Sequence, residues 1–244
     1  MSNGTVALVT GGSRGIGAAT ALRLAEDGLD VALTYVDGAE AAAGVAGRIE
    51  ALGRRALAVR ADVGDPAQAV AAVEETVRGL GRIDALVNNA GVGVLGPLDG
   101  LALADVDRVL AVNVRGVFLT AQAAAARMGS GGRIVTIGSC MVQRVPGPGG
   151  TLYAMSKAAL TGLTKALARE LGGRGITANL VHPGPVDTDL NPADGPHAAS
   201  QSALTALGRF GTAREVAALV SFLAGPDAAY VTGAEFAVDG GHAA

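Results

Sequence analysis

A tyrosine and a lysine lie four positions apart, at Tyr153 and Lys157, in a segment whose pattern predicts a helix over 152–171. Residues at i and i+4 share one face of a helix, so the phenol and the ammonium should lie together. A free phenol has a pKa near ~10 and exchanges protons poorly at neutral pH, but a nearby cation lowers that pKa. The pair could therefore pass a proton to or from an oxygen atom, although an incidental surface pair has the same spacing.

Two other polar residues could complete a reaction site. Ser139 follows a predicted strand at 133–137, at the carboxyl edge where doubly wound sheets bind ligands; its hydroxyl could donate to a substrate carbonyl or only close a turn. Asn113 lies in a predicted helix, where asparagine is a poor helix former, so it either bends the helix or lines a polar site. Cys140 fits a small core residue better than a nucleophile, because no activating base is evident.

Lysine is almost absent from the rest of the chain. Of the 19 basic residues, only Lys157 and Lys165 are lysines, which leaves 17 arginines. Arginine carries the same charge but is bulkier and planar. The use of a lysine at position 157, four residues after Tyr153, therefore favours a site that needs a compact ammonium group.

A glycine-rich segment, Thr10-Gly11-Gly12-Ser13-Arg14-Gly15-Ile16-Gly17, joins a predicted strand at 6–9 to a predicted helix at 15–27. Glycines allow a sharp turn and a close approach of backbone to a pyrophosphate, and a helix N-terminus offers free N–H groups to the anion. A tight structural turn is the alternative. The strand before the loop and the helix after it favour a dinucleotide site.

The residues near the predicted second strand bear on the choice of cofactor. That strand ends at Tyr35 rather than at the acidic residue that commonly binds the ribose hydroxyls of NAD. Arg14 could meet a 2′-phosphate as a charge-assisted fork, which favours NADP. Asp37 argues against NADP, because its carboxylate could bind a ribose hydroxyl of NAD. Alternatively, Asp37 is only a turn residue before Gly38.

Apolar strands alternate with helical segments along the chain, which predicts a parallel sheet covered by helices on both faces. We expect one α/β domain over 1–244, a Rossmann-type doubly wound parallel sheet of about seven strands. Residues 183–207 are irregular and too long for a plain connector, so a substrate lid is predicted at about 185–208, with a solvated surface loop as the alternative. The predicted strands are 6–9, 31–35, 56–59, 83–87, 133–137, 176–180 and 235–238, and the predicted helices are 15–27, 39–52, 66–80, 103–128, 152–171 and 213–223.

Composition narrows the class of protein. Half of the 244 residues are hydrophobic and the net charge is −3 with no basic run, which argues against nucleic acid as the main partner. The single cysteine cannot form an internal disulfide. The start, 1–9, lacks a signal-peptide pattern, and no apolar run of about 18 residues predicts a membrane span. We therefore expect a cytoplasmic protein with neither a membrane nor a nucleic acid as partner.

Taken together, these residues resemble the short-chain dehydrogenase/reductase family, over essentially the whole chain. Thr10–Gly17 matches the family's Thr-Gly-x3-Gly-x-Gly loop, and Ser139, Tyr153 and Lys157 with Asn113 match its catalytic tetrad. Four more segments match family motifs, namely Asn88-Asn89-Ala90-Gly91, Asp62-Val63, Pro183-Gly184 with Thr188, and Val238-Asp239-Gly240-Gly241.

The resemblance implies a role for each residue. Tyr153 is the general acid or base, Lys157 bonds the nicotinamide ribose and lowers the pKa of Tyr153, and Ser139 orients the carbonyl. Asn113 holds a water that connects Lys157 to solvent, and no metal is used. The cofactor-binding residues implied by the motifs are Gly11, Ser13, Arg14, Gly15, Ile16, Gly17, Tyr35, Asp62, Val63, Asn89, Ala90, Gly91, Tyr153, Lys157, Pro183, Gly184, Val186 and Thr188.

Within the family, the chain is most similar to 3-oxoacyl-acyl-carrier-protein reductases and related carbonyl reductases. That similarity implies NADP(H) as the preferred cofactor with NAD(H) possible, a homotetramer, and reduction of a ketone that is a 3-oxoacyl thioester or a small carbonyl compound. The segment 143–151 would border the substrate, and the alanine-rich stretch 121–126 fits a subunit interface or ordinary burial. Two alternatives stay open: an NAD-dependent alcohol dehydrogenase, supported by Asp37, and a catalytically silent cofactor-binding regulatory protein.

Overall fold

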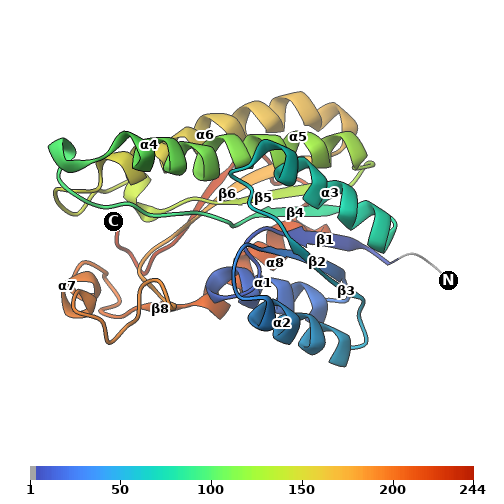
Figure 1. The fold of residues 1–244 in the computed structure, drawn as a ribbon, viewed down its shortest axis with the longest axis horizontal. Coiled ribbons are helices and arrows are strands. Elements are labelled where there is room, and N and C mark those ends of the chain that lie inside the picture. Colours follow the sequence, from blue (N-terminus) through green and yellow to red (C-terminus); the bar gives the residue numbers. More distant parts are fainter. Residues whose placement is uncertain (1–3) are drawn as a thin grey trace.

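Seven parallel strands form the central sheet of the computed structural model, which describes residues 4–244 (Figure 1). Their order is β3-β2-β1-β4-β5-β6-β9. The predicted parallel sheet of about seven strands is thereby confirmed. Residues 1–3, which belong to the start predicted to lack a signal peptide, lie outside the described part. The strands are β1 (Val6–Val9), β2 (Asp30–Tyr35), β3 (Ala56–Arg60), β4 (Ala85–Asn88), β5 (Arg133–Ile137), β6 (Thr177–Pro183) and β9 (Glu235–Val238).

Helices cover both faces of this sheet (Figure 1). One face packs against α1 (Gly15–Glu26), α2 (Ala39–Ala51) and α8 (Ala213–Ala224). The other packs against α3 (Pro66–Leu80), α5 (Val117–Arg127) and α6 (Thr151–Leu171), and α4 (Leu103–Leu110) lies in the same layer beside α6 (Figure 1). Strand β1 is apolar throughout, and β1 and β5 are buried along their whole length because helices cover both faces of the sheet there.

The strand order reverses between β1 and β4, so the loops that leave these two strands turn in opposite directions. In doubly wound sheets such a reversal opens a crevice at the carboxyl edge of the strands, where ligands bind. Figure 1 shows α7 (Ala198–Ala203) and the C-terminus at this end of the molecule, and the N-terminus at the other. The topology therefore fixes where a site must lie.

The predicted helix over 103–128 is not regular. A π-helical segment, Ala111–Gly116, separates α4 from α5. The combined helix Leu103–Arg127 has 25 residues and a mean hydropathy of 1.4 in its apolar window, enough by length and composition to cross a membrane, but half of that window is buried in the fold. It packs against α3 and α6 as a core helix does.

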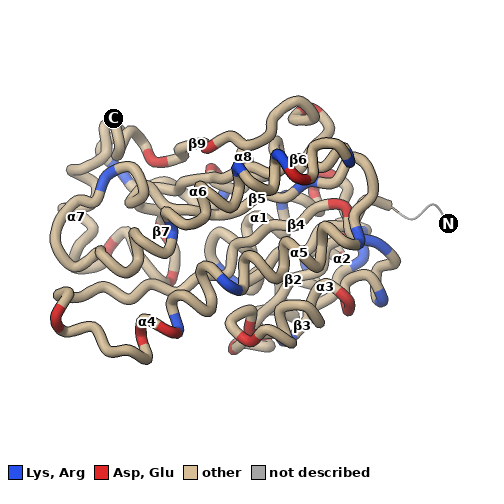
Figure 2. The backbone as a smooth tube through the Cα atoms, turned by 90° about the horizontal axis from the view of Figure 1, so that it is seen from above, with Lys and Arg blue, Asp and Glu red and all other residues tan. Residues whose placement is uncertain are grey.

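Residues 185–208, predicted as a lid, contain more regular structure than the sequence indicated. Val186–Asp187 forms β7, which pairs with β8 (Gly211–Thr212), and α7 follows. The side chains of Asn191 and Gln201 exchange two hydrogen bonds, of 2.8 and 3.0 Å. Acidic and basic residues are interspersed along the chain (Figure 2).

Candidate active site

The glycine-rich loop places an uncapped helix N-terminus at the crevice. Helix α1 begins at Gly15, and the preceding Arg14 is extended and makes no side-chain cap within residues 4–244. Gly15 has φ +53°, and a Cβ on Gly17 would lie 2.2 Å from the Gly11 carbonyl oxygen. Only glycine permits this conformation and this close approach. The first-turn N–H groups are thus free for an anion such as a pyrophosphate, so these residues fit a dinucleotide.

Hydrogen bonds hold the loop against the end of β4. The Asn89 side chain donates to the carbonyl oxygens of Thr10 and Gly11, at 2.9 and 3.0 Å. The Thr10 hydroxyl accepts from the backbone N–H groups of Asn89 and Ala90, each at 3.0 Å. The Asn88–Gly91 segment therefore fixes the loop as well as flanking the crevice.

Arg14 lies over the turn that follows β2. One guanidinium nitrogen is 2.8 Å from the position a Cβ on Gly38 would take, and Arg14 itself is exposed. Tyr35 ends β2 and is partly buried, and Asp37 is exposed beside the same turn. A positive group therefore stands where the adenosine ribose of a dinucleotide is expected.

Asp62 is already engaged by another side chain. Its carboxylate accepts a 2.7 Å hydrogen bond from Arg108 and another, of 2.9 Å, from the Gly64 N–H. Burial acts to raise its pKa, but these hydrogen bonds and the Arg108 charge outweigh it and lower the pKa. The neighbouring Val63 is buried. The sequence analysis did not identify Arg108 as a site residue. Only its charge and its place near the start of the predicted helix over 103–128 could have indicated it.

Asn113 lies in the π-helical segment and is fully buried. Its side chain donates to and accepts from the backbone of Val92, at 2.9 Å each, and donates to the Ser156 hydroxyl at 3.0 Å. The first of the two alternatives is confirmed, because the helix is distorted at Asn113 and its amide bonds the backbone of the loop after β4. Ser156, one residue before Lys157, was missed.

The Lys157 ammonium is buried beneath Tyr153. Its Nζ donates to the Ile137 carbonyl oxygen at 2.9 Å and lies 5.9 Å from the centroid of the Tyr153 ring. Burial lowers the pKa of Lys157 to about 8. The predicted shared face of the helix is confirmed, with α6 carrying both groups at the carboxyl edge.

The pKa of Tyr153 differs from the expectation. Burial raises it above its ordinary value, while a hydrogen bond with Ser139 lowers it in part. The predicted lowering by Lys157 is therefore wrong for the protein chain alone, because desolvation of the phenol dominates and the ammonium is bonded to Ile137. A raised pKa keeps the phenol protonated at neutral pH and makes it a weaker acid than a free phenol, so release of the proton requires a charge that stabilises the phenolate.

Ser139 follows β5, and its hydroxyl lies within hydrogen-bonding reach of the Tyr153 phenol. Its Oγ accepts from the Met141 N–H at 3.2 Å, which leaves the hydroxyl hydrogen to donate. Its backbone N–H donates to His182 Nδ1, also at 3.2 Å. His182 was missed by sequence reasoning; its one signal is its place directly before Pro183-Gly184.

The segment after β6 closes the other side of the crevice. Gly184 lies against Asp239, where a Cβ would be 2.6 Å from the Asp239 Cα. Thr188 lies over the glycine-rich loop, its methyl group 3.3 Å from the position of a Cβ on Gly15. Val186 is buried. The glycine-rich loop, the segment after β4, the Tyr153–Lys157 pair and the 183–188 segment therefore lie against one another at the carboxyl edge of the sheet.

The glycine-rich loop, Ser139, Tyr153 and Lys157 lie at one edge of the sheet, an arrangement that fits an oxidoreductase using a dinucleotide. The family model described as "Enoyl-(Acyl carrier protein) reductase" matches residues 11–243. The chain belongs to the short-chain dehydrogenase/reductase family and is an NAD(P)-dependent enzyme acting on CH–OH and C=O groups.

Three similar proteins illustrate the range within the family. The cyclic-di-GMP-binding biofilm dispersal mediator protein of Escherichia coli (strain K12) is 44% identical, over 97% of this chain and 96% of that protein. The 3-oxoacyl-[acyl-carrier-protein] reductase of Synechocystis sp. (strain ATCC 27184 / PCC 6803 / Kazusa) is 41% identical over 97% and 96%. A short-chain dehydrogenase from Burkholderia cenocepacia J2315, solved in complex with NADP, is 55% identical with a TM-score of 0.97, covering 98% of each chain.

Proposed function

We propose that this enzyme is an NADPH-dependent ketone reductase. The observation that carries the proposal is that Tyr153, Ser139 and Lys157 lie together at the carboxyl edge of the sheet, with the Lys157 Nζ 5.9 Å from the centroid of the Tyr153 ring. A phenol that stays protonated at neutral pH is the form needed to protonate a carbonyl oxygen. The buried Lys157 lies next to it.

The chain's own groups divide the work of the reduction. Ser139 donates a hydrogen bond to the carbonyl oxygen and orients it, and Tyr153 delivers its proton to that oxygen as the alcohol forms. Bound NADPH supplies the hydride to the carbonyl carbon. Lys157 binds the nicotinamide ribose, and Asn113 holds the water through which a proton returns to the site.

Arg14 supports NADPH over NADH. Its exposed guanidinium over the turn after β2 is placed to meet a 2′-phosphate, and the similar Burkholderia enzyme was solved with NADP. Asp37 lies at the same turn, where its carboxylate could bind a ribose hydroxyl, so our proposal includes NAD(H) as a second cofactor.

A 3-oxoacyl thioester or a small carbonyl compound is the substrate class we favour. The relative from Synechocystis is named as a 3-oxoacyl-[acyl-carrier-protein] reductase. We propose that the segments 143–151 and 185–208 border the substrate and that the second is a substrate lid. The proposal includes a cytoplasmic location, which the free, buried Cys140 fits, and a homotetramer.

Substitution of Tyr153 tests the reductase proposal. Tyr153→Phe removes only the hydroxyl, so NADPH oxidation with a panel of ketones should fall to background, while NADPH binding, followed by the fluorescence of the bound nicotinamide, should persist. Turnover near the wild-type rate would refute the role of the phenol.

A second candidate is a regulatory nucleotide-binding protein, which the name of the Escherichia coli relative favours. It predicts saturable binding of cyclic di-GMP by calorimetry, together with no turnover of any ketone or alcohol in the panel. Turnover without cyclic di-GMP binding would exclude it. An NAD-dependent alcohol dehydrogenase would instead bind NADH more tightly than NADPH.

A further inference from the structure

A buried histidine next to the site is not used by the proposed reduction. His182 on β6 is fully buried, and its Nδ1 accepts the Ser139 backbone N–H at 3.2 Å. Its Nε2 lies 3.0 Å from a carboxylate oxygen of Glu235 on β9. The ring packs directly on the backbone before Ser139, because a Cβ on Gly138 would be only 2.5 Å from His182 Nδ1.

The Glu235 carboxylate determines which ring nitrogen of His182 carries the proton. It accepts from the Thr161 hydroxyl at 2.8 Å and forms a 3.1 Å ion pair with Lys165. Burial acts to raise its pKa, but the bonds from His182, Thr161 and Lys165 together lower it, so the group is ionised. An anion there requires a proton on Nε2, which leaves Nδ1 free to accept from Ser139.

The residues that hold Glu235 come from the helix that carries the reacting pair. Tyr153, Lys157, Thr161 and Lys165 follow one another at steps of four along α6, so they form one stripe of the helix. The two lysines of the chain both lie on this stripe. One end of the stripe carries the phenol, and the other binds Glu235 and, through His182, Ser139.

We propose that His182 is a positioning residue, which with Glu235 and Lys165 fixes the backbone of Ser139 relative to Tyr153. The network runs from the end of β5, which carries Ser139, through His182 on β6 and Glu235 on β9 to α6, which carries Tyr153. The effect on turnover rests on the proposed ketone reductase, whereas the effect on the Ser139 backbone does not.

Two substitutions of His182 separate positioning from packing. His182→Leu replaces the imidazole with an apolar side chain of similar length, so the Ser139 N–H loses its hydrogen-bond acceptor. His182→Asn places an amide oxygen where Nδ1 was, so it retains that acceptor while losing much of the ring. We expect His182→Leu to lower kcat by about tenfold to a hundredfold, as a ~1 Å misplacement of a reacting group would, with the Kd for NADPH unchanged. His182→Asn should recover most of the wild-type kcat.

Amide hydrogen exchange at Ser139, followed by NMR, gives a readout without turnover. The Ser139 N–H should exchange slowly in the wild type and in His182→Asn, and faster in His182→Leu. If the wild type reduces none of the ketones offered, the proposed function fails, but this arm still tests the network.

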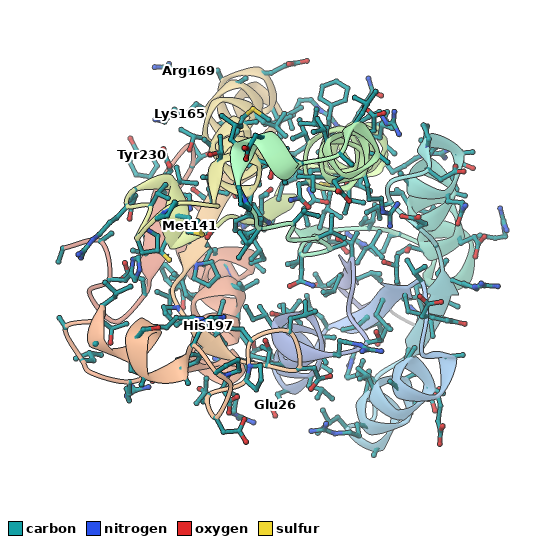
Figure 3. All side chains as sticks on the ribbon, turned by 60° about the vertical axis from the view of Figure 1, so that its left-hand side comes forward. Glu26, Met141, Lys165, Arg169, His197 and Tyr230 are labelled. Carbon is teal, nitrogen blue, oxygen red and sulfur yellow. The ribbon has the colours of Figure 1, made fainter. Side chains whose placement is uncertain are left out.

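Lys165→Met tests the far end of the network, and Arg169→Met is its matched control. Both side chains project from α6 at the outer edge of the molecule, and Arg169 lies one turn further along (Figure 3). Lys165→Met removes the cation paired with the Glu235 carboxylate, and because this ion pair is partly exposed the effect should be small, a fall in kcat of about twofold to fivefold. Arg169→Met should leave it unchanged.

The proposal is overturned if the two His182 variants lose turnover equally, in proportion to their loss of folded protein. It is also overturned if Ser139 exchange is the same in His182→Leu and the wild type, or if Lys165→Met and Arg169→Met behave alike.

Discussion

At the scale of single residues, the environment of Lys157 decides how the site responds to pH. Its ammonium is almost fully buried, with one backbone carbonyl as its hydrogen-bond acceptor, and burial lowers its pKa to about 8. The group is charged below that pH and neutral above it. Tyr153 stays protonated throughout this range, because its own pKa is raised.

We predict that ketone reduction slows as the pH rises through about 8. The reason is that Lys157 loses the charge that assists proton delivery, while the phenol still holds its proton. The measurement is kcat between pH 6 and 9.5 with saturating NADPH. A rate that is flat across that range would show that the charge on Lys157 is not required.

Arg14 carries the prediction for cofactor preference. A hydrogen bond to a charged group contributes about 1.5–3 kcal/mol, so Arg14→Ala should raise the Kd for NADPH by roughly tenfold to a hundredfold and leave that for NADH unchanged. Asp37→Asn at the same turn is the control. If instead Asp37→Asn weakens NADH and Arg14→Ala affects both cofactors alike, the NAD-dependent alternative holds.

The residue types of the site could be predicted because they carry chemistry at fixed spacings, as in Tyr153 and Lys157. What the sequence could not supply is their surroundings. The bond between Lys157 and Ile137, the ion pair between Asp62 and Arg108, and the contact of Ser139 with His182 join residues far apart in the chain. The pKa of Tyr153 departs from the expectation for the same reason, since burial of the phenol is a property of the folded state.

At the scale of elements, the alternation of strands and helices was sufficient to predict the sheet. Departures occur where tertiary contacts override the local pattern. Asn113 bonds the Val92 backbone and the helix accommodates it as a π segment, which periodicity alone cannot indicate. The two-residue strands β7 and β8 form only by pairing with each other, so residues 185–208 looked irregular in sequence.

Helix α8 offers a prediction of element stability. The Thr212 hydroxyl accepts from the Glu215 N–H, and the Glu215 carboxylate accepts from the Thr212 N–H, which forms a capping box. Thr212→Ala should lower the free energy of unfolding by about 1 kcal/mol, measured by urea denaturation. Thr5→Ala, an exposed threonine outside any helix, is the control; equal losses in both would argue against the cap.

At the scale of the whole molecule, one groove lies away from the crevice, on the helical layer formed by α4, α5 and α6. It has a volume of about 860 Å³ and mixes apolar side chains such as Phe118 and Leu163 with Asp107, Arg108 and Arg115. Phe118 is 47% exposed, which is unusual for a phenylalanine. A face with an apolar centre and charges of both signs suits contact with a second copy of itself.

The homotetramer we propose uses this face, and Phe118→Glu tests it. A carboxylate on each copy would lie in the apolar centre of a symmetric contact, where burying the unpaired charge opposes association. The wild type should sediment at four times the 23.9 kDa chain mass, and the variant at a lower multiple while keeping the circular dichroism of the folded chain. Leu52→Glu, an exposed apolar residue at the end of α2, is the control and should assemble normally. A wild type that sediments as a single chain, or a Phe118→Glu variant that assembles as the wild type does, would show that this face is not the interface.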